Sequence, residues 1–507
     1  MSTVSRRTAL RALAAAPAVL VSRKSSAQNL PEIAAGPFNG TAESLRQYQI
    51  PDWFRDAKFG IWAHWGPQSG VEDGDWYARN MYMQGSEQYR YHLEHYGHPS
   101  KVGYKDLCPL WKGDRFDPDH LMSLYQKAGA KYFMSMGVHH DNFDLWKSEH
   151  QPRWNAVNMG PKKDVVGLWR AAAHKHGLRF AVSEHLSNSF NWLAVSHGAD
   201  KTGSMAGVSY DGTDPAYADL YHPFPKDRPI PANGMSRDCP DAWKRQYFQR
   251  IQDLIDHYQP DLLYTDGAIP FGEIGYRLVS HYYNVVRSGV YTSKEPKDCE
   301  QGTCALDIER GVADDIRPHP WQTDTCIGNW HYKRGIQYKS AKTVVDLLCD
   351  IVSRNGNLML NIPLPNSGMP DDEELKVVAG ITGWMAVNSE AIYGTRPWKI
   401  SGNAAAASAA ARTSFNENKR RDLTANDVRF TTKGSALYAF VMGWPEREAV
   451  IPTLALGGKL GVGKIHNVEL LGHKGRLKFS QDQAALKIEL PPAKTSEHAV
   501  AFKVIGA

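Results

Sequence analysis

The feature that most constrains this chain is an apolar run that ends abruptly in ionisable residues. Residues 131–146 read KYFMSMGVHHDNFDLW, so a strand-like stretch finishes in two histidines and an aspartate. Three other runs end in the same way, namely FGIWAHWG at 59–66, LRFAVSEH at 178–185 and DLLYTDG at 261–267. In a parallel α/β barrel the carboxyl ends of the strands meet at one face and build the active site there. The pattern predicts a (β/α)8-type, TIM-like barrel with one shared pocket.

The segments between these runs have the features of amphipathic helices. Apolar residues recur at three-and-four spacing, Asp or Pro stands at the start, and Gly or Pro follows the end. The expected helices cover residues 116–129, 165–177, 241–258 and 342–355, and another strand follows at 357–363. Strands alternating with helices at this spacing predict βαβ units with right-handed crossovers.

The composition changes near residue 400. Residues 402–412 are almost all small, and short alternating runs separated by Gly, Pro and Asn follow. These runs lie at 428–432, 436–441, 468–471, 477–479, 486–490 and 499–504. They predict a small antiparallel β-sandwich. We therefore expect a catalytic barrel over residues 28–398, a linker over 399–412 and the sandwich over 413–507.

The N-terminal 27 residues read as an export signal of the twin-arginine type. SRRTALR at 5–11 is positively charged, a modest apolar stretch follows at 12–21, and small residues come next. The apolar stretch is shorter than the roughly 20 residues that span a bilayer. We expect a mature protein in the periplasm or secreted, with no membrane association once the signal is removed.

Charge and cysteine content exclude some functions. The 59 basic and 54 acidic residues are nearly balanced, whereas nucleic-acid binding needs clustered positive charge. The six cysteines show no CxxC spacing, which argues against structural zinc and against a disulfide framework. Cys299 and Cys304 form the nearest plausible pair.

Asp266 is the best candidate for chemistry. Cleaving a glycoside needs two carboxylates, one at the anomeric carbon and one that protonates the leaving oxygen. Asp266 ends a strand, and Gly267 lets the backbone turn away from the pocket. The alternative is that Asp266 caps a helix that begins near Phe271.

The four histidines at the strand ends, His64, His139, His140 and His185, could contact sugar hydroxyls or bind a metal. Adjacent strand residues point to opposite faces, so His139 and His140 both face the pocket only at a bulge or a strand end. No His-Glu-x-x-His motif is present. We favour sugar contact and expect neither a metal nor a cofactor, with one of these two histidines as a possible packing residue.

Two other features have open alternatives. Trp76 and Tyr77 follow the first strand and either form the floor of a sugar subsite or pack onto the barrel. Glu184 is either a catalytic acid or a buried ion-pair partner.

Taken together, several motifs make the chain resemble the family 29 glycoside hydrolases, which are retaining exo-α-L-fucosidases. They occur in the family's order at 53–66 (WFRDAKFGIWAHWG), 75–82 (DWYARNMY), 139–143 (HHDNF), 261–267 (DLLYTDG), 321–332 and 357–363 (NLMLNIP). The resemblance covers roughly residues 45 to 395, and the C-terminal region is also similar to that family's second domain.

The resemblance implies that Asp266 is the nucleophile of a double displacement through a glycosyl-aspartate. It further implies that Glu309, 12 positions before Trp321, is the general acid/base, with Glu300 and Glu295 as alternatives on the same loop. The substrate would be a fucosylated oligosaccharide or glycoconjugate. The expected sugar contacts are His64, Trp76, Tyr77, His139, His140, Glu184, His185, Tyr264 and Trp321.

Two departures from the family pattern border the expected pocket. Gln322 follows Trp321 where many relatives have Glu, and the third strand ends in SEHL at 183–186. A related α-L-glycoside such as an α-L-galactoside therefore remains an alternative substrate. The rivals from other classes are a catalytically inactive carbohydrate-binding barrel and a metal-dependent hydrolase of the same barrel type. The natural glycan, its linkage and the oligomeric state stay open.

Overall fold

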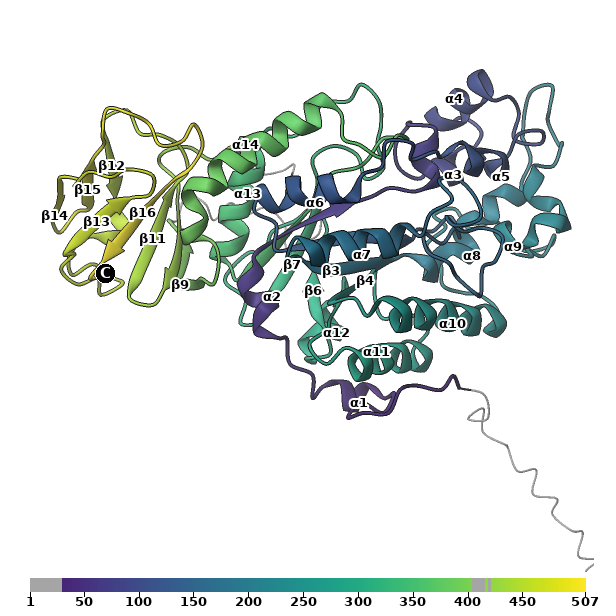
Figure 1. The fold of residues 1–507 in the computed structure, drawn as a ribbon, viewed down its shortest axis with the longest axis horizontal. Coiled ribbons are helices and arrows are strands. Elements are labelled where there is room, and N and C mark those ends of the chain that lie inside the picture. The colour runs from purple at the N-terminus through teal and green to yellow at the C-terminus, as the bar shows by residue number, and fades with distance from the viewer. Residues whose placement is uncertain (1–29, 404–414, 418–420) are drawn as a thin grey trace, which may run out of the picture.

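The computed structural model describes residues 30–403, 415–417 and 421–507. Within these residues, eight parallel strands pair in sequence order, and the last closes onto the first (Figure 1). The strands are β1 (Phe59–Ala63), β2 (Tyr132–Val138), β3 (Arg179–Glu184), β4 (Leu262–Thr265), β5 (Val290–Ser293), β6 (Ala305–Asp307), β7 (Trp321–Cys326) and β8 (Gly356–Asn361). The predicted barrel is confirmed.

Helices surround this barrel, and the four predicted ones lie close to their expected positions as α6 (Pro118–Lys127), α7 (Val165–Lys175), α10 (Asp241–Tyr258) and α13 (Ala341–Ser353). The other long ones are α11 (Glu273–Val285) and α14 (Asp372–Asn388). The shorter ones are α1 (Ala42–Leu45), α2 (Asp52–Ala57), α3 (Tyr77–Asn80), α4 (Glu87–His95), α5 (Tyr104–Leu107), α8 (Ser189–Trp192), α9 (Ala218–Tyr221) and α12 (Pro296–Glu300). Aspartate caps explain two starts, because Asp117 accepts from the His120 N–H and Asp164 from the Gly167 N–H.

The strands are apolar because the barrel wall is covered on both faces. All seven residues of β2 are buried, as are all residues of β1 and β4. In register, Gly60 lies opposite Tyr132 and Ala181 opposite Leu262. This register brings the residues that follow β1, β2, β3 and β4 to the same edge of the barrel.

The end of β2 resolves the question of the two adjacent histidines. Its pairing with β3 shifts register between Met136 and Val138, and the strand stops at Val138. His139 and His140 therefore follow the strand and are free of its strict alternation.

The C-terminal region forms two antiparallel sheets that share one hydrophobic core. In the described residues, the first sheet has the order β13-β16-β11-β10-β9 and the second β12-β15-β14. The strands are β9 (Arg396–Gly402), β10 (Val428–Lys433), β11 (Ala436–Val441), β12 (Glu448–Ile451), β13 (Asn467–Leu470), β14 (Phe479–Gln481), β15 (Leu486–Glu489) and β16 (Val500–Ile505). The boundary expected at residue 398 falls inside β9, which pairs with β10.

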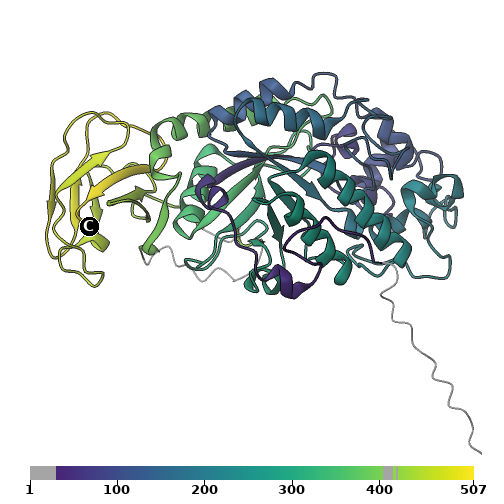
Figure 2. The same ribbon diagram turned by 60° about the horizontal axis from the view of Figure 1, so that its bottom comes forward.

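Figures 1 and 2 place these sheets at one end of the molecule, beside α13 and α14. Trp384 on α14 donates its indole N–H to the Ala499 carbonyl at 2.7 Å. Arg429 on β10 donates from Nε to the Asp350 carboxylate on α13, and both side chains are fully buried. The two parts of the chain are thus joined by a buried ion pair as well as by apolar contacts.

The predicted export signal and the predicted linker fall largely on residues that the structure does not describe. The export signal predicted for residues 1–27 lies outside the described residues, as does most of the predicted linker. In the described ranges, no helix combines the length and apolar character needed to cross a bilayer.

Cys299 in α12 and Cys304 just before β6 are the nearest plausible cysteine pair of the sequence. Their Sγ atoms lie 2.6 Å apart.

We expect Arg429→Ala to lower the free energy of unfolding by about 1–3 kcal/mol, because it removes one of the buried arginines that pair with Asp350 and leaves the other, Arg354. Urea unfolding followed by circular dichroism measures this. Lys478→Ala is the matched control, because Lys478 faces Glu489 at 3.7 Å on an exposed surface and its loss should leave stability unchanged. Equal effects of the two substitutions would contradict this role for Arg429.

Candidate active site

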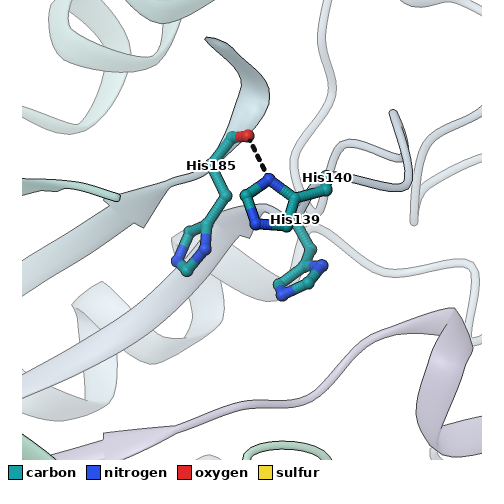
Figure 3. Close-up of side chains that lie close together, drawn as sticks. All are labelled: His139, His140 and His185. Carbon is teal, nitrogen blue, oxygen red and sulfur yellow. Dashed lines mark hydrogen bonds between the residues drawn. The ribbon is translucent and has the colours of Figure 1, made fainter. Parts of the chain in front are cut away.

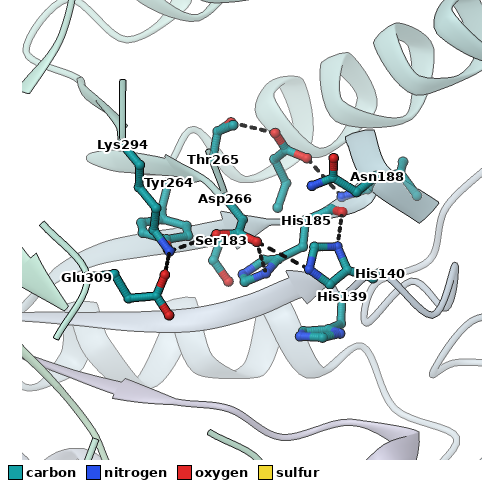
Figure 4. Close-up of polar contacts among 12 residues, drawn as sticks. His139, His140, Ser183, His185, Asn188, Tyr264, Thr265, Asp266, Lys294 and Glu309 are labelled. Atoms are coloured by element: carbon teal, nitrogen blue, oxygen red, sulfur yellow. Dashed lines mark hydrogen bonds and ion pairs between the residues drawn. The ribbon is translucent and has the colours of Figure 1, made fainter. Parts of the chain in front are cut away.

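A cavity of about 320 Å³ opens at the carboxyl ends of the barrel strands. Its lining is polar and aromatic, and Figure 4 shows the central polar contacts. The lining residues are Trp62, His64, Asp75, Trp76, His139, His140, His185, Met235, Tyr264, Asp266, Gly267, Lys294, Glu309, Asp324, Trp330 and Phe415. Eight of the predicted site residues are among them: His64, Trp76, His139, His140, His185, Tyr264, Asp266 and Glu309.

Asp266 follows β4 directly and points into this cavity. Its carboxylate accepts from Lys294 Nζ at 2.8 Å and lies 3.2 Å from His140 Nε2 and 3.7 Å from His185 Nδ1. Burial by itself would raise the pKa of Asp266, but Lys294 and the two histidines outweigh it and hold that pKa well below its usual range. Asp266 is therefore ionised. It does not cap α11, which begins at Glu273 after Gly272.

Gly267 makes the turn that follows Asp266. Its φ of +108° lies in a region that side-chain-bearing residues rarely adopt. Beside this turn, Arg237 Nη2 donates to the Asp266 carbonyl at 3.0 Å and fixes the backbone of the strand end.

Lys294 joins Asp266 to Glu309. The same Nζ lies 2.8 Å from Asp266 Oδ1 and 2.6 Å from Glu309 Oε2, so these two oxygens are no farther apart than the sum of the two distances. That sum is compatible with the 5 to 5.5 Å typical of retaining glycosidases and is below the roughly 6.5 to 9.5 Å of inverting pairs.

Glu309 has the opposite pKa shift to Asp266. Burial raises its pKa, and the negative charges of Asp324 and Asp266 add to that effect, while Lys294 opposes it. The net direction is upward, so Glu309 holds its proton to a higher pH than an exposed glutamate. A nucleophile and an acid need one carboxylate that ionises readily and another that keeps its proton, and Asp266 and Glu309 differ in this way.

The histidines form a compact cluster (Figure 3). His140 donates from Nδ1 to the His185 carbonyl at 2.8 Å, and His139 Nδ1 lies 3.0 Å from Gln68 Nε2. Burial lowers the pKa of His64, His139 and His185, so these three rings are neutral. A neutral imidazole has one donor and one acceptor nitrogen, which suits sugar hydroxyls.

Two groups have the ligand types and spacing for a metal ion, namely His139 with His140 and His185, and Asp75 with His139 and His331. In each group some ligand atoms already have partners. His140 Nδ1 faces the His185 carbonyl, and His331 Nδ1 lies 2.5 Å from Asp75 Oδ1. His140 Nε2 also faces Asp266 at 3.2 Å, so both nitrogens of this ring have partners within the protein.

Three predicted sugar contacts do not line the cavity. Tyr77 is buried, with its hydroxyl 3.1 Å from His92 Nδ1, so it packs onto the barrel. Glu184 is buried behind Asp266 and accepts from Tyr247 at 2.9 Å, from the Leu186 N–H at 3.0 Å and from Thr265. Trp321 is buried and donates its indole N–H to the Arg354 carbonyl. We correct these three predictions to structural roles.

The alternative acids and the departure at Gln322 also lie outside the lining. Glu295 caps α12 by accepting from the Lys297 N–H, and Glu300 ends that helix. Gln322 is buried, donates to Asp307 Oδ1 at 2.9 Å and accepts from the Tyr132 hydroxyl at 3.0 Å. We expected Gln322 to border the pocket, and in the structure it does not.

Several residues that line the cavity were not predicted from the sequence. Lys294 directly follows β5, so the rule that identified Asp266 applied to it as well. Asp324 accepts from the Tyr264 hydroxyl at 2.9 Å, and it lies within β7, which is polar throughout its middle. Phe415 is far away along the chain, and no local pattern marks it.

A closed parallel barrel whose cavity holds two carboxylates with opposite pKa shifts defines a glycoside hydrolase of the two-carboxylate type. Comparison with known families agrees. The sequence model of the family "Alpha-L-fucosidase" matches residues 25–390. The sequence model of the family "Alpha-L-fucosidase C-terminal domain" matches residues 420–504. The chain belongs to the α-L-fucosidase family.

Individual relatives are similar over most of their length. Human plasma α-L-fucosidase is 28% identical over 485 residues, which cover 91% of this chain and 90% of the relative. Human tissue α-L-fucosidase is 26% identical over 520 residues, covering 92% and 95%. A structure of Thermotoga maritima α-fucosidase in complex with fucose has a TM-score of 0.70 at 25% identity, covering 92% of this chain and all of the other.

We expect Lys294→Met to move both limbs of the pH profile of kcat/KM to higher pH. Lys294 lowers the pKa of Asp266 and of Glu309, so its loss raises both. Asp266 then becomes protonated at a higher pH, and Glu309 keeps its proton to a higher pH. Steady-state hydrolysis of an aryl glycoside across pH measures the limbs.

The matched control is Lys342→Met, which removes a lysine paired with Asp346 on α13, away from the cavity. Its profile should be that of the unmodified protein. Limbs that move in opposite directions in Lys294→Met would contradict the shared influence of this lysine.

Proposed function

We propose that the protein is a retaining exo-α-L-fucosidase that removes terminal α-L-fucose from oligosaccharides or glycoconjugates, with Asp266 as nucleophile and Glu309 as acid/base. One observation carries this assignment: a buried lysine holds two carboxylates of opposite pKa shift close together. The family supplies the sugar, since its human and bacterial members are named as fucosidases.

In the first step the ionised Asp266 attacks the anomeric carbon of the bound sugar. Glu309 gives its proton to the departing glycosidic oxygen, so the leaving sugar departs as a neutral alcohol. Lys294 keeps Asp266 ionised before the attack. The product of this step is a sugar bonded to Asp266 with its anomeric configuration inverted.

In the second step Glu309, now ionised, takes a proton from a water molecule that attacks the same carbon. The bond to Asp266 breaks, and the configuration inverts again, so the overall result is retention. The short separation of the two carboxylates supports this route, because no room is left between them for the water of a single-step inversion.

The cavity also has the chemistry to hold a monosaccharide. Neutral His185 can donate to one hydroxyl and accept from another, while His64 and His139 each offer the one ring nitrogen that does not face Asn361 or Gln68. Trp62, Trp76 and Trp330 supply apolar faces for the C–H side of the ring. We further propose that the protein works outside the cytoplasm, on the basis of the twin-arginine pattern at residues 5–11.

We expect Asp266→Gly to lose hydrolysis of an aryl α-L-fucoside by about 10,000-fold, because the nucleophile is gone. Added azide fits beside the shortened side chain and attacks the substrate once, which gives β-L-fucosyl azide. Product stereochemistry by NMR measures this. The unmodified protein, assayed on aryl α-L-fucosides and α-L-galactosides, is the reference. Activity near the reference level would remove Asp266 from the nucleophile role.

We expect Glu309→Ala to lose roughly 100- to 10,000-fold in kcat/KM on a substrate with a poor leaving group. With a good leaving group, azide attacks the glycosyl-enzyme without base help, and two inversions give α-L-fucosyl azide. Glu295→Ala and Glu300→Ala are matched controls on the neighbouring loop and should hydrolyse at the reference rate. Azide rescue of either control in place of Glu309→Ala would overturn the assignment.

A further inference from the structure

The segment 415–417 reaches the active site from outside both family matches, which end at residue 390 and resume at residue 420. Phe415 donates its backbone N–H to the Glu309 carbonyl at 2.8 Å, and Glu417 donates to the Arg310 carbonyl at 3.0 Å. The segment therefore lies along the residues that carry the proposed acid/base.

Polar contacts hold this segment in place. The Glu417 carboxylate accepts from Thr325 Oγ1 at 2.6 Å and from Lys339 Nζ at 3.0 Å, and it is almost fully buried. The Asn416 side chain accepts from the Val312 N–H at 3.1 Å and donates to the Val312 carbonyl at 3.2 Å. Phe415 is thus positioned by the two residues that follow it.

The Phe415 side chain has features that packing does not explain. It is 55% exposed, which is more than any other large hydrophobic side chain on the surface of the described residues. Its φ of +62° lies in the left-handed region, which is unfavourable for a bulky residue. The ring nevertheless lines the cavity together with Asp266 and Glu309. An exposed apolar ring in a strained conformation at this position indicates a ligand contact.

The chemistry decides which part of the substrate the ring meets. Glu309 protonates the oxygen of the leaving group, so that group lies on the Glu309 side of the cleaved bond. Phe415 is one backbone hydrogen bond from Glu309. We propose that Phe415 forms a leaving-group subsite, where it stacks on the apolar face of the pyranose ring that carries the terminal sugar. This inference rests on the proposed function.

The test compares two substrates that share the terminal sugar. One is an α-L-fucosyl disaccharide whose leaving group is a pyranose, and the other is α-L-fucosyl fluoride, whose leaving group has no ring. We expect Phe415→Ala to lower kcat/KM on the disaccharide about 5-fold more than on the fluoride, which is the loss of a stacking contact of about 1 kcal/mol. Phe415→Trp keeps an aromatic face and should restore the ratio.

The control is Leu456→Ala, which removes an exposed apolar side chain of the C-terminal domain that does not line the cavity. Its ratio should equal that of the unmodified protein, and thermal melting checks that each variant is folded. Equal losses of Phe415→Ala on both substrates, or no loss on the disaccharide, would overturn the subsite. Absence of fluoride hydrolysis by the unmodified protein would instead overturn the proposed function.

Discussion

The ion pairs of Lys294 are the interaction on which the site depends. A single buried ammonium group contacts Asp266 and Glu309 and lies 3.6 Å from Asp324. Without it, burial and mutual repulsion would favour protonation of Asp266 and Glu309. With it, Asp266, which also faces His140 and His185, becomes readily ionised, while Glu309 keeps a raised pKa. The difference between two otherwise similar carboxylates is therefore produced by their surroundings, and these surroundings are set by where β4, β5 and β6 end.

The rest of the pocket keeps its net charge low, which makes this division possible. Burial and the neighbouring Asp324 raise the pKa of Asp307 well above its usual range, so Asp307 is neutral and accepts a hydrogen bond from Gln322. A glutamate at position 322 would lack the amide donor that Asp307 uses. Burial also keeps His64, His139 and His185 neutral. A cavity with few uncompensated charges suits a neutral sugar and leaves Lys294 to act mainly on the two reacting carboxylates.

Strand-terminal polar residues were a sound basis for predicting the barrel and much of the site. Asp266, His64, His139, His140 and His185 follow apolar strands, and parallel pairing brings such positions together whatever their separation in sequence. The same reasoning failed where direction mattered. Glu184 ends β3 but turns into the wall, and Tyr77 is adjacent to a lining residue but lies on the inner side of α3. Which of two adjacent residues faces the cavity cannot be derived from sequence here, because it depends on the backbone conformation of a short loop. Trp76, which lines the cavity next to the buried Tyr77, has a positive φ.

Phe415 shows a second limit, and it bears on how the two domains cooperate. The barrel alone supplies Asp266, Glu309, Lys294 and the histidines, so the proposed acid and nucleophile both come from one domain. The cavity lining, in contrast, also contains Phe415, which follows α14 and β9 along the chain. The anchors of the segment 415–417, Thr325 and Lys339, belong to the barrel. Since these anchors face the segment through polar groups, they fix its position without adding to either hydrophobic core. Because Phe415 is held by polar contacts of its two neighbours, the proposed leaving-group contact is set by a segment separate from the strand ends that carry Asp266 and Lys294.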